Sequence, residues 1–446
     1  MNWIGHGLMP KRYGLPLLVF LHVVATCVSL ACVAYLYSDY HIFFRPDGLA
    51  SAIAVVAAFS TVAVFFVYAE FSFGYFVGFY LFTLIAGYLW LNQFSEFIYN
   101  HSLSGLSAAA SGVAFLVPAL FIRTPLPQHW TLSPKALDRL ADVILVLGLV
   151  VVSVGATYDF KIVSIEHIYD YRESLRAPRA LNYLMGVMSG ALLPFAFACF
   201  IERRRMWRAL AALALLLAFY PVTVSKISLL TSVWLVVMTV LSRIFELRIA
   251  VVISLLAPLA AGLLAFLLFE LQWASYEAAV PYFGLVNFRM IAIPSLAMDY
   301  YNDFFFKHDL TYYCQVGVFK ALMSCPYDEP LSVVIYKAFG IGGYFNAGLF
   351  ATEGVASIGP LFAPVAALAC GLVVAAGNRT SAHLPPRFVL VSGAVLVQLM
   401  LNVPFTTVLL THGAILLFLL WYVTPLTRQE SASDKSYPDA AAPASR

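Results

Sequence analysis

Residues 249–269 read IAVVISLLAPLAAGLLAFLLF and carry no charged side chain. An α-helix of this length extends about 30 Å, which is the thickness of the hydrocarbon core of a bilayer. The stretch therefore predicts a helix that crosses a membrane. Comparable apolar runs occur at 15–37, 49–69, 72–91, 104–122, 139–157, 181–200, 356–377, 387–403 and 406–424.

The composition of the whole chain agrees with this interpretation. Of its 446 residues, 62% are hydrophobic and 11% are charged. Soluble domains carry about 25% charged residues. These values exclude a disordered chain, a nucleic-acid-binding module and an ordinary cytosolic enzyme. They are typical of a protein that crosses the membrane many times.

Two shorter apolar runs, 208–222 and 227–242, flank a polar break that contains Lys226. Together they indicate two spans that meet at a polar turn. We therefore predict an all-α polytopic integral membrane protein with about 12 transmembrane helices, which form a single domain over residues 1–427. The polar residues 428–446, rich in Ala, Pro and Ser, are predicted to be a disordered cytoplasmic tail.

Lysine and arginine residues predict the orientation, because the cytoplasmic loops of membrane proteins are enriched in them. If the N-terminus is cytoplasmic, sixteen of the 26 basic residues fall in cytoplasmic segments, including the run Arg203-Arg204-Arg205. We therefore expect a multi-pass protein of the bacterial inner membrane with both termini in the cytoplasm. Two long segments then face the periplasm, at about 158–180 and 270–355. The second is expected to contain short helices near 294–306 and 331–339.

Basic residues near the periplasmic face are candidates for binding an anion. Arg172 and Arg176 stand four residues apart, so that on a helix they share one face. The planar guanidinium group suits the oxygen atoms of a diphosphate. Lys226 is a second candidate, because a charge at membrane depth is costly and often functional, and Arg289 is a third. The alternatives are a solvated loop for the arginines and a side chain that reaches the interface for the lysine.

The second periplasmic segment interleaves aromatic and polar residues, among them Tyr300, Tyr301, Asp303 and His308. Sugar rings stack on aromatic side chains, and their hydroxyl groups take polar partners. The pattern therefore favours a carbohydrate site, although an aromatic belt at the membrane interface has a similar composition. In such a site Asp303 or His308 could accept the proton of a hydroxyl group.

Glu353 stands at the expected start of a span, within a glycine-rich stretch. These glycines do not form a nucleotide loop, because there is no Walker lysine and no preceding strand. The carboxylate could serve as a general base, as an anchor in a salt bridge or as a proton-coupling residue. Nearby, Cys314 and Cys325 are candidates for a disulfide if their compartment is oxidising. No spacing of Cys and His predicts a metal site, and no cofactor is expected.

Taken in order, these features resemble the oligosaccharide repeat-unit polymerases of bacterial surface polysaccharides, the Wzy-type or O-antigen polymerase group. The resemblance covers roughly residues 155–410. One pattern of the group, Arg or His followed at a fixed distance by Gly in the outer loops, has no clean match here. The resemblance rests on the outer arginines Arg172 and Arg176, on Ser225-Lys226 between paired short spans, on Arg289 in a large penultimate outer loop, and on Glu353-Gly354 at a glycine-rich span start.

The resemblance implies a glycosyltransferase that joins undecaprenyl-diphosphate-linked oligosaccharides in O-antigen or exopolysaccharide biosynthesis. It also implies membrane lipids, a chain-length regulator and a flippase as partners, and no nucleic acid. The resemblance further implies a role for each candidate. The diphosphate would be bound by Arg172, Arg176, Lys226 and Arg289, and the rest of the substrate by Tyr300 and Tyr301. The proton of the acceptor hydroxyl would be taken by Glu353, Asp303 or His308.

Other functions stay open at this point. An O-antigen ligase uses the same lipid-linked donor and transfers the glycan to the lipid A core. A glycosyltransferase that uses lipid-phosphate sugars would place its acid in the first outer loop, which here contains Asp39 and Asp47. A non-enzymatic transporter of polysaccharide or lipid-linked oligosaccharide is the alternative outside the enzymes, and it would place charges near the middle of its spans.

Overall fold

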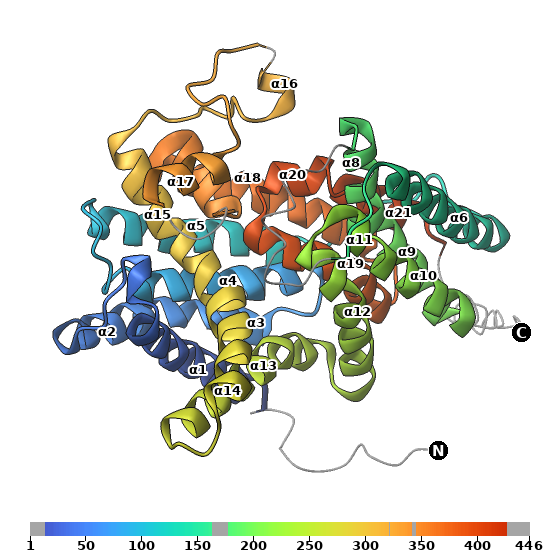
Figure 1. Cartoon of the computed structure of the whole chain (residues 1–446). Helices are drawn as coiled ribbons and strands as arrows, with labels where there is room; N and C mark the ends of the chain where they lie inside the picture. Colours follow the sequence, from blue (N-terminus) through green and yellow to red (C-terminus); the bar gives the residue numbers. More distant parts are fainter. Residues whose placement is uncertain (1–13, 163–176, 321, 341–344, 426–446) are drawn as a thin grey trace, which may run out of the picture.

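The computed structural model describes residues 14–162, 177–320, 322–340 and 345–425 (Figure 1). Within them the regular elements are helices, and one isolated bridge joins Ile42 and Ser95. Ten helical runs are long and apolar enough to cross a membrane, and three shorter apolar helices accompany them. The predicted all-α membrane fold is thus confirmed, whereas the tail 428–446 lies outside the described residues.

The α-helices have the following bounds: α1 Gly14–Leu36, α2 Leu49–Ser60, α3 Val64–Tyr68, α4 Phe73–Leu91, α5 His101–Phe121, α6 Pro134–Tyr158, α8 Arg179–Val187, α9 Leu193–Glu202, α10 Met206–Ala218, α11 Tyr220–Thr223, α12 Lys226–Ile244, α13 Leu247–Glu270, α14 Tyr276–Phe283, α15 Ile293–Lys307, α16 Gly317–Lys320, α17 Leu331–Phe339, α18 Ser357–Ser381, α19 Pro386–Asn402, α20 Phe405–Leu410 and α21 Ala414–Val423. Three π-helical segments interrupt or extend them, at Met188–Leu192, Gly284–Ala292 and Phe350–Ala356.

One end of the bundle is held together by arginine ion pairs, and we call it the basic end. Arg205 pairs with Asp138 at 3.0 Å, and Arg123 pairs with Glu70 at 2.7 Å. The described chain begins and finishes at this end, where Gln128 donates a hydrogen bond to the carbonyl oxygen of Tyr422. Between those points the chain passes back and forth through α1, α2–α3, α4, α5, α6, α8–α9, α10–α11, α12, α13, α18, α19 and α20–α21, and we call the opposite end the site end.

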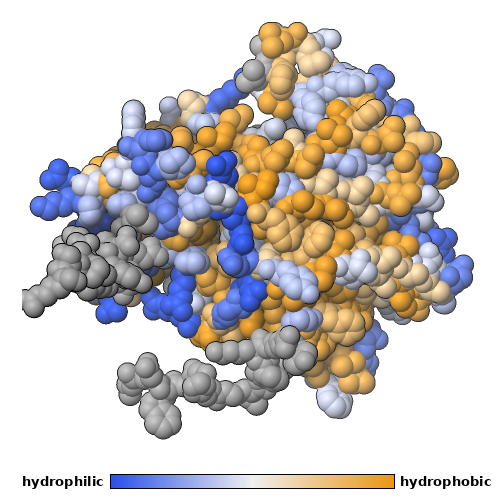
Figure 2. Space-filling view, turned by 180° about the vertical axis from the view of Figure 1, so that it is seen from behind, coloured by the Kyte–Doolittle hydropathy of each residue, from blue (hydrophilic) through white to orange (hydrophobic). Residues whose placement is uncertain are grey.

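Helix α4 is the centre of the bundle, since all of its residues are buried. Gly74 lets α4 approach α5 closely, because a Cβ atom at this position would lie 2.0 Å from the carbonyl oxygen of Ala119. Asn378 of α18 ties the two helices together. It accepts a hydrogen bond from the Gly74 amide and donates one to the Ala119 carbonyl. Outside this core, large apolar side chains cover the surface broadly, as Figure 2 shows.

Residues 270–355 differ from their prediction as a loop with short helices. They contain the predicted helix at 331–339 as α17, but they begin with a continuous helical run, Tyr276–Lys307, which joins α14, a π-helical segment and α15. The run contains enough apolar residues to form a buried helix. The sequence did not reveal this, because burial depends on packing partners that are distant along the chain. By length and composition alone this run could cross a membrane.

The contacts of this run show that it crosses over other helices near the site end. Asn287 donates to the carbonyl oxygen of Leu259 in α13, and Ser295 donates to that of Leu84 in α4. Farther along, Asn302 accepts a hydrogen bond from Ser104 in the first turn of α5. In Figure 1 the run accordingly lies at a steep angle to α4. It therefore forms a buried cross-brace whose two ends both lie at the site end.

Candidate functional site

Glu353 lies in the π-helical segment that precedes α18, and its side chain is buried. Its Oε1 accepts hydrogen bonds from the backbone amide of Thr406 at 2.9 Å and from the Thr406 hydroxyl at 2.8 Å. Its Oε2 accepts one from the hydroxyl of Thr352 at 2.6 Å. Within the described residues Glu353 forms no ion pair. Neutral donors hold this carboxylate, and the anchoring salt bridge considered above is not formed among them.

Two tyrosines flank Glu353. Tyr301 of α15 is buried and lies close to the Glu353 carboxylate. Tyr313 donates its phenolic hydrogen to the Glu353 carbonyl oxygen at 3.1 Å. Burial raises the pKa of Tyr313 above its ordinary value, and the nearby carboxylate of Glu353 adds to this rise. The phenol therefore stays protonated and keeps its hydrogen bond at neutral pH.

Asp303 and His308 sit at the last turns of α15, on the same element as Tyr301. The Asp303 carboxylate is buried and accepts two hydrogen bonds from the ammonium group of Lys307, at 2.7 and 2.9 Å. His308 is exposed, its ring stacks on Phe304 at 4.0 Å, and its Nδ1 lies 2.8 Å from the Phe304 carbonyl oxygen. The Nε2 atom of His308 therefore points away from the helix, where it can reach a proton on a bound molecule.

Tyr300 does not face a binding space as the sequence suggested. Its ring is fully buried and is surrounded by Phe97, Phe339 and Phe345, with centroids between 4.6 and 5.0 Å away. Its hydroxyl group has no hydrogen-bond partner among the described residues. The position of Tyr300 is explained by helix periodicity, because it lies one residue from Tyr301 and therefore projects from a different side of α15.

A second polar cluster at the site end escaped the sequence analysis, and we call it the Asp299 network. The hydroxyl of Tyr99 lies within hydrogen-bonding distance of Asp299 of α15 and, at 2.8 Å, of the Asn92 side-chain oxygen, and its one hydrogen is shared between these two acceptors. The Nδ1 of His101 lies 2.7 Å from the same Asn92 oxygen. Tyr88 lies 3.2 Å from Tyr99, hydroxyl to hydroxyl, which extends the network into α4. These partners are about 200 positions from Asp299 in the sequence, so no local pattern could have joined them.

Arg289 lies on the same helical run as Asp303, in the π-helical segment Gly284–Ala292. Fourteen residues of helix separate the two, which corresponds to roughly 20 Å. Arg289 is half-buried and neighbours Tyr40 in the connection between α1 and α2. Burial raises the pKa of Tyr40, and the guanidinium of Arg289 opposes that rise. The structure thus places Arg289 at the site end but not in contact with the Glu353 cluster.

The remaining basic candidates cannot be joined to this cluster. Arg172 and Arg176 lie outside the described residues. The backbone of Lys226 begins α12 at the site end, directly after a turn in which Val224 has a φ of 45°, but its side chain is outside the described structure. Helix α12 packs mainly on α19, α10 and α13. The turn therefore lies against a different part of the bundle from α15.

A disulfide closes the segment that follows α15. Cys314 and Cys325, the pair that the sequence left open, are joined with their Cα atoms 5.3 Å apart. The same segment is pinned to the Glu353 helix, because the amide of Thr311 donates to the carbonyl oxygen of Ala356 at 2.8 Å. The disulfide thus limits the freedom of the backbone that carries Tyr313 and lies beside Glu353.

Together, Glu353, Asp303, His308 and the hydroxyl groups around them could hold hydroxylated groups and accept a proton. Among the described residues, no three His, Cys, Asp or Glu side chains are grouped as they would be to hold a metal ion. Two of the three described π-helical segments carry a candidate residue, Arg289 or Glu353, and such segments are frequent at functional sites. The chain matches no protein-family model, and neither the curated proteins nor the solved structures contain a detectable relative.

Proposed function

We propose that this membrane protein polymerises lipid-diphosphate-linked oligosaccharide units, as the proteins that its sequence resembles do. The site end would face the periplasm of a bacterium, and both termini would lie in the cytoplasm. The observation that carries the proposal is the buried Glu353, which forms no ion pair within the described residues and lies beside α15 at one end of a bundle of membrane helices. Such a carboxylate can accept a proton from a hydroxyl group while the lipid part of a substrate remains in the membrane.

The reaction would be an inverting glycosyl transfer. A hydroxyl oxygen at the non-reducing end of one unit attacks the anomeric carbon of the growing chain. The bond between that carbon and the diphosphate oxygen breaks, and undecaprenyl diphosphate leaves with the electron pair. The hydroxyl proton passes to a carboxylate, and the candidates are Glu353 and Asp303, or to His308. Because the diphosphate is already a good leaving group, most of the rate enhancement would come from positioning the two substrates and from stabilising the charge that develops on the diphosphate.

Basic side chains would stabilise the diphosphate as its negative charge develops. Arg289 is the described candidate, and Arg172, Arg176 and Lys226 are proposed for the same role. A guanidinium can bind two phosphate oxygens at once, which favours the leaving group over the neutral sugars. The buried aromatic side chains of Phe350 and Tyr301 would exclude water and so limit hydrolysis of the donor.

The test is polymer formation by the purified full-length chain in lipid nanodiscs, with a lipid-diphosphate-linked repeat unit as the substrate. Gel separation of the products should show a ladder of chain lengths, and a host with the gene deleted should carry single repeat units on its surface. The variant Glu329→Gln, which alters an exposed carboxylate paired with Lys337, serves as the matched control and should retain the ladder.

Other outcomes would contradict the proposal in recognisable ways. Bare core in the deleted host, with long lipid-linked polymer accumulating, would indicate a ligase. An unchanged surface glycan with no product in nanodiscs would indicate transport or another activity. The partners proposed here, a flippase and a chain-length regulator, would be sought by crosslinking in the native membrane only after the ladder is observed.

A further inference from the structure

A groove of about 920 Å³ opens between α2, the end of α4 and α5. Its part nearest the site end is polar and is formed by Arg45, Gln93 and His101, among others. Its other part is apolar and runs between small and hydrophobic residues of α2 and α5, such as Ala58 and Ala110. The groove is therefore amphipathic along its length, in the direction in which a membrane lipid would lie.

The charges of the groove favour an anion at its polar part. Its lining contains Arg45 and no Asp or Glu. Arg45 is exposed and forms no ion pair within the described residues. The hydroxyl of Ser51 donates to Oε1 of Gln93 at 2.7 Å, which turns the Nε2 hydrogens of Gln93 toward other acceptors. The guanidinium of Arg45 and the side-chain amide of Gln93 thus offer a cation and a hydrogen-bond donor, and phosphate oxygens bind to such groups.

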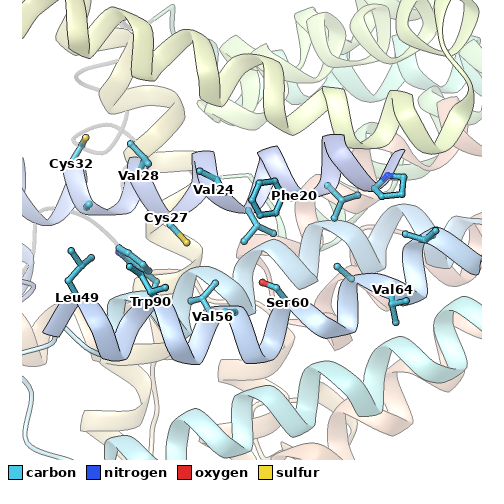
Figure 3. Close-up of a pocket in the computed structure, with 18 of the residues that line it drawn as sticks. Phe20, Val24, Cys27, Val28, Cys32, Leu49, Val56, Ser60, Val64 and Trp90 are labelled. Carbon is cyan, nitrogen blue, oxygen red and sulfur yellow. The ribbon is translucent and has the colours of Figure 1, made fainter. Parts of the chain in front are cut away.

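The opposite face of α2 offers an informative contrast. There a groove of about 790 Å³ lies between α1 and α2, and its lining contains no charged residue. Figure 3 shows side chains such as Val24 and Cys27 from α1 and Val56 from α2 around this space. It can take hydrocarbon, and its lining offers the neutral polar atoms of Ser60 and Trp90 but no charge for an anionic head group. Of these two grooves, the one on the α5 side combines an apolar channel with a cation that has no ion-pair partner in the described part of the chain.

The α5-side groove is also connected to the candidate site. Asn92 and His101 line it, and both belong to the Asp299 network. Through Tyr99 this network reaches Asp299 on α15, four residues before Asp303. A head group bound beside Arg45 would therefore be linked through Asn92 and Tyr99 to α15, the helix that carries Asp303.

We propose that this groove binds the substrate lipid itself, with the diphosphate at Arg45 and Gln93 and the first part of the polyprenyl chain between α2 and α5. This assignment rests on the proposed polymerase function for its choice of lipid. It adds a diphosphate contact in the first connection of the chain, a region in which none of the candidates for this reaction lies.

Adjacent alanines on α2 provide a matched pair for the test. Ala58 lines the α5-side groove and Ala57 lines the apolar groove, and both are exposed. Native mass spectrometry of the purified full-length chain would measure its dissociation constant for undecaprenyl diphosphate and, separately, for phosphatidylglycerol. We expect Ala58→Trp and Arg45→Ala each to weaken binding of undecaprenyl diphosphate about tenfold, and Ala57→Trp to leave it unchanged.

Several outcomes would overturn the assignment. Equal binding by the Ala57→Trp and Ala58→Trp proteins would exclude the groove, and Ala110→Trp replaces Ala58→Trp if the latter does not yield folded protein. Equal affinity for phosphatidylglycerol would mean a general site for anionic lipids. Because binding is read without turnover, a normal groove result with no polymer ladder would reject the polymerase alone, whereas a ladder with unaffected groove variants would reject the groove alone.

Discussion

Two of the buried carboxylates at the site end, Asp299 and Glu353, are held in different ways. Asp299 contacts side chains from the connection between α4 and α5, and those side chains are hydrogen-bonded to one another. Glu353 instead contacts Thr406, in the six-residue helix α20, and its own neighbour Thr352 within a π-helical segment. The first acid joins long helices through its Oδ1, while its Oδ2 is buried with no partner among the described residues. The second sits among short and irregular elements, which can rearrange at lower cost.

This contrast indicates which acid stabilises the fold and which could act on a substrate. Removing one member of a buried hydrogen-bond network weakens the bonding of its polar neighbours. Each buried polar group that loses a partner lowers the free energy of unfolding. Removing the charge of Glu353 leaves its neutral donors able to bind an uncharged acceptor. Asp299 should therefore be mainly structural, and Glu353 should be mainly functional. The following predictions test that difference.

The largest effect is expected for Glu353→Gln. The amide oxygen of glutamine can still accept hydrogen bonds from Thr406, so the thermal unfolding temperature in detergent should change little. Polymer formation should fall at least about 100-fold, because general-base catalysis contributes roughly that much. The ladder assay in nanodiscs measures this, and Glu329→Gln is the control. Retention of the ladder would show that Glu353 is not the base and would move the role to Asp303 or His308.

A large loss of stability is expected for Asp299→Ala. The hydroxyl of Tyr99 would keep Asn92 as an acceptor, but the buried contact between α15 and the α4–α5 connection would be lost and a small cavity left, so we expect a destabilisation of about 2 kcal/mol. Asp299→Asn keeps an acceptor oxygen at the same place and should cost about half as much. Fluorescence-monitored thermal unfolding of both variants would measure the difference. If Asp299→Ala unfolds like the wild-type protein, the network is not structural, and the comparison with Glu353 fails.

A smaller and more local effect is expected when the disulfide is removed. Changing both Cys314 and Cys325 to Ser should favour local opening of residues 308–330 by about 2 kcal/mol, because the closed loop is short. Limited proteolysis of the purified protein should then cut this segment at least tenfold faster. In intact cells the two wild-type thiols should react with maleimide only after reduction, provided that the site end faces an oxidising compartment. Reaction without reduction would contradict the proposed orientation.

The sequence predicted the helices well, because a span has a local signature of about 20 apolar residues. About 12 spans were predicted, and the described residues contain ten helical runs long and apolar enough to cross a membrane and three shorter apolar helices, one of which follows Lys226. It did not predict that Tyr276–Lys307 is one continuous run. A helix buried by crossing over others needs partners such as Leu84 and Leu259, and these are distant in the sequence.

The candidate site was predicted less completely for a related reason. Glu353, Asp303 and Tyr301 could be selected by residue type near a span boundary, and the structure brings Glu353 and Tyr301 together. The burial of Tyr300 could not be seen, because it depends on aromatic rings from three separate segments. The Asp299 network was missed because its partners, including Tyr99, have ordinary sequence surroundings.

The smallest effect should come from Lys307, the ion-pair partner of Asp303. The Lys307 side chain is 48% exposed, whereas the Asp303 side chain is only 4% exposed, so solvent screens one partner of the pair alone. Lys307→Ala leaves a buried carboxylate without this cation, and we expect a destabilisation of about 1 kcal/mol, measured by thermal unfolding. Asp303, however, would lose its only described cation, so the polymer ladder should still respond if this carboxylate contacts substrate. A stable variant with an unchanged ladder would remove Asp303 from the site and leave Glu353 and His308 as the proton acceptors to be distinguished.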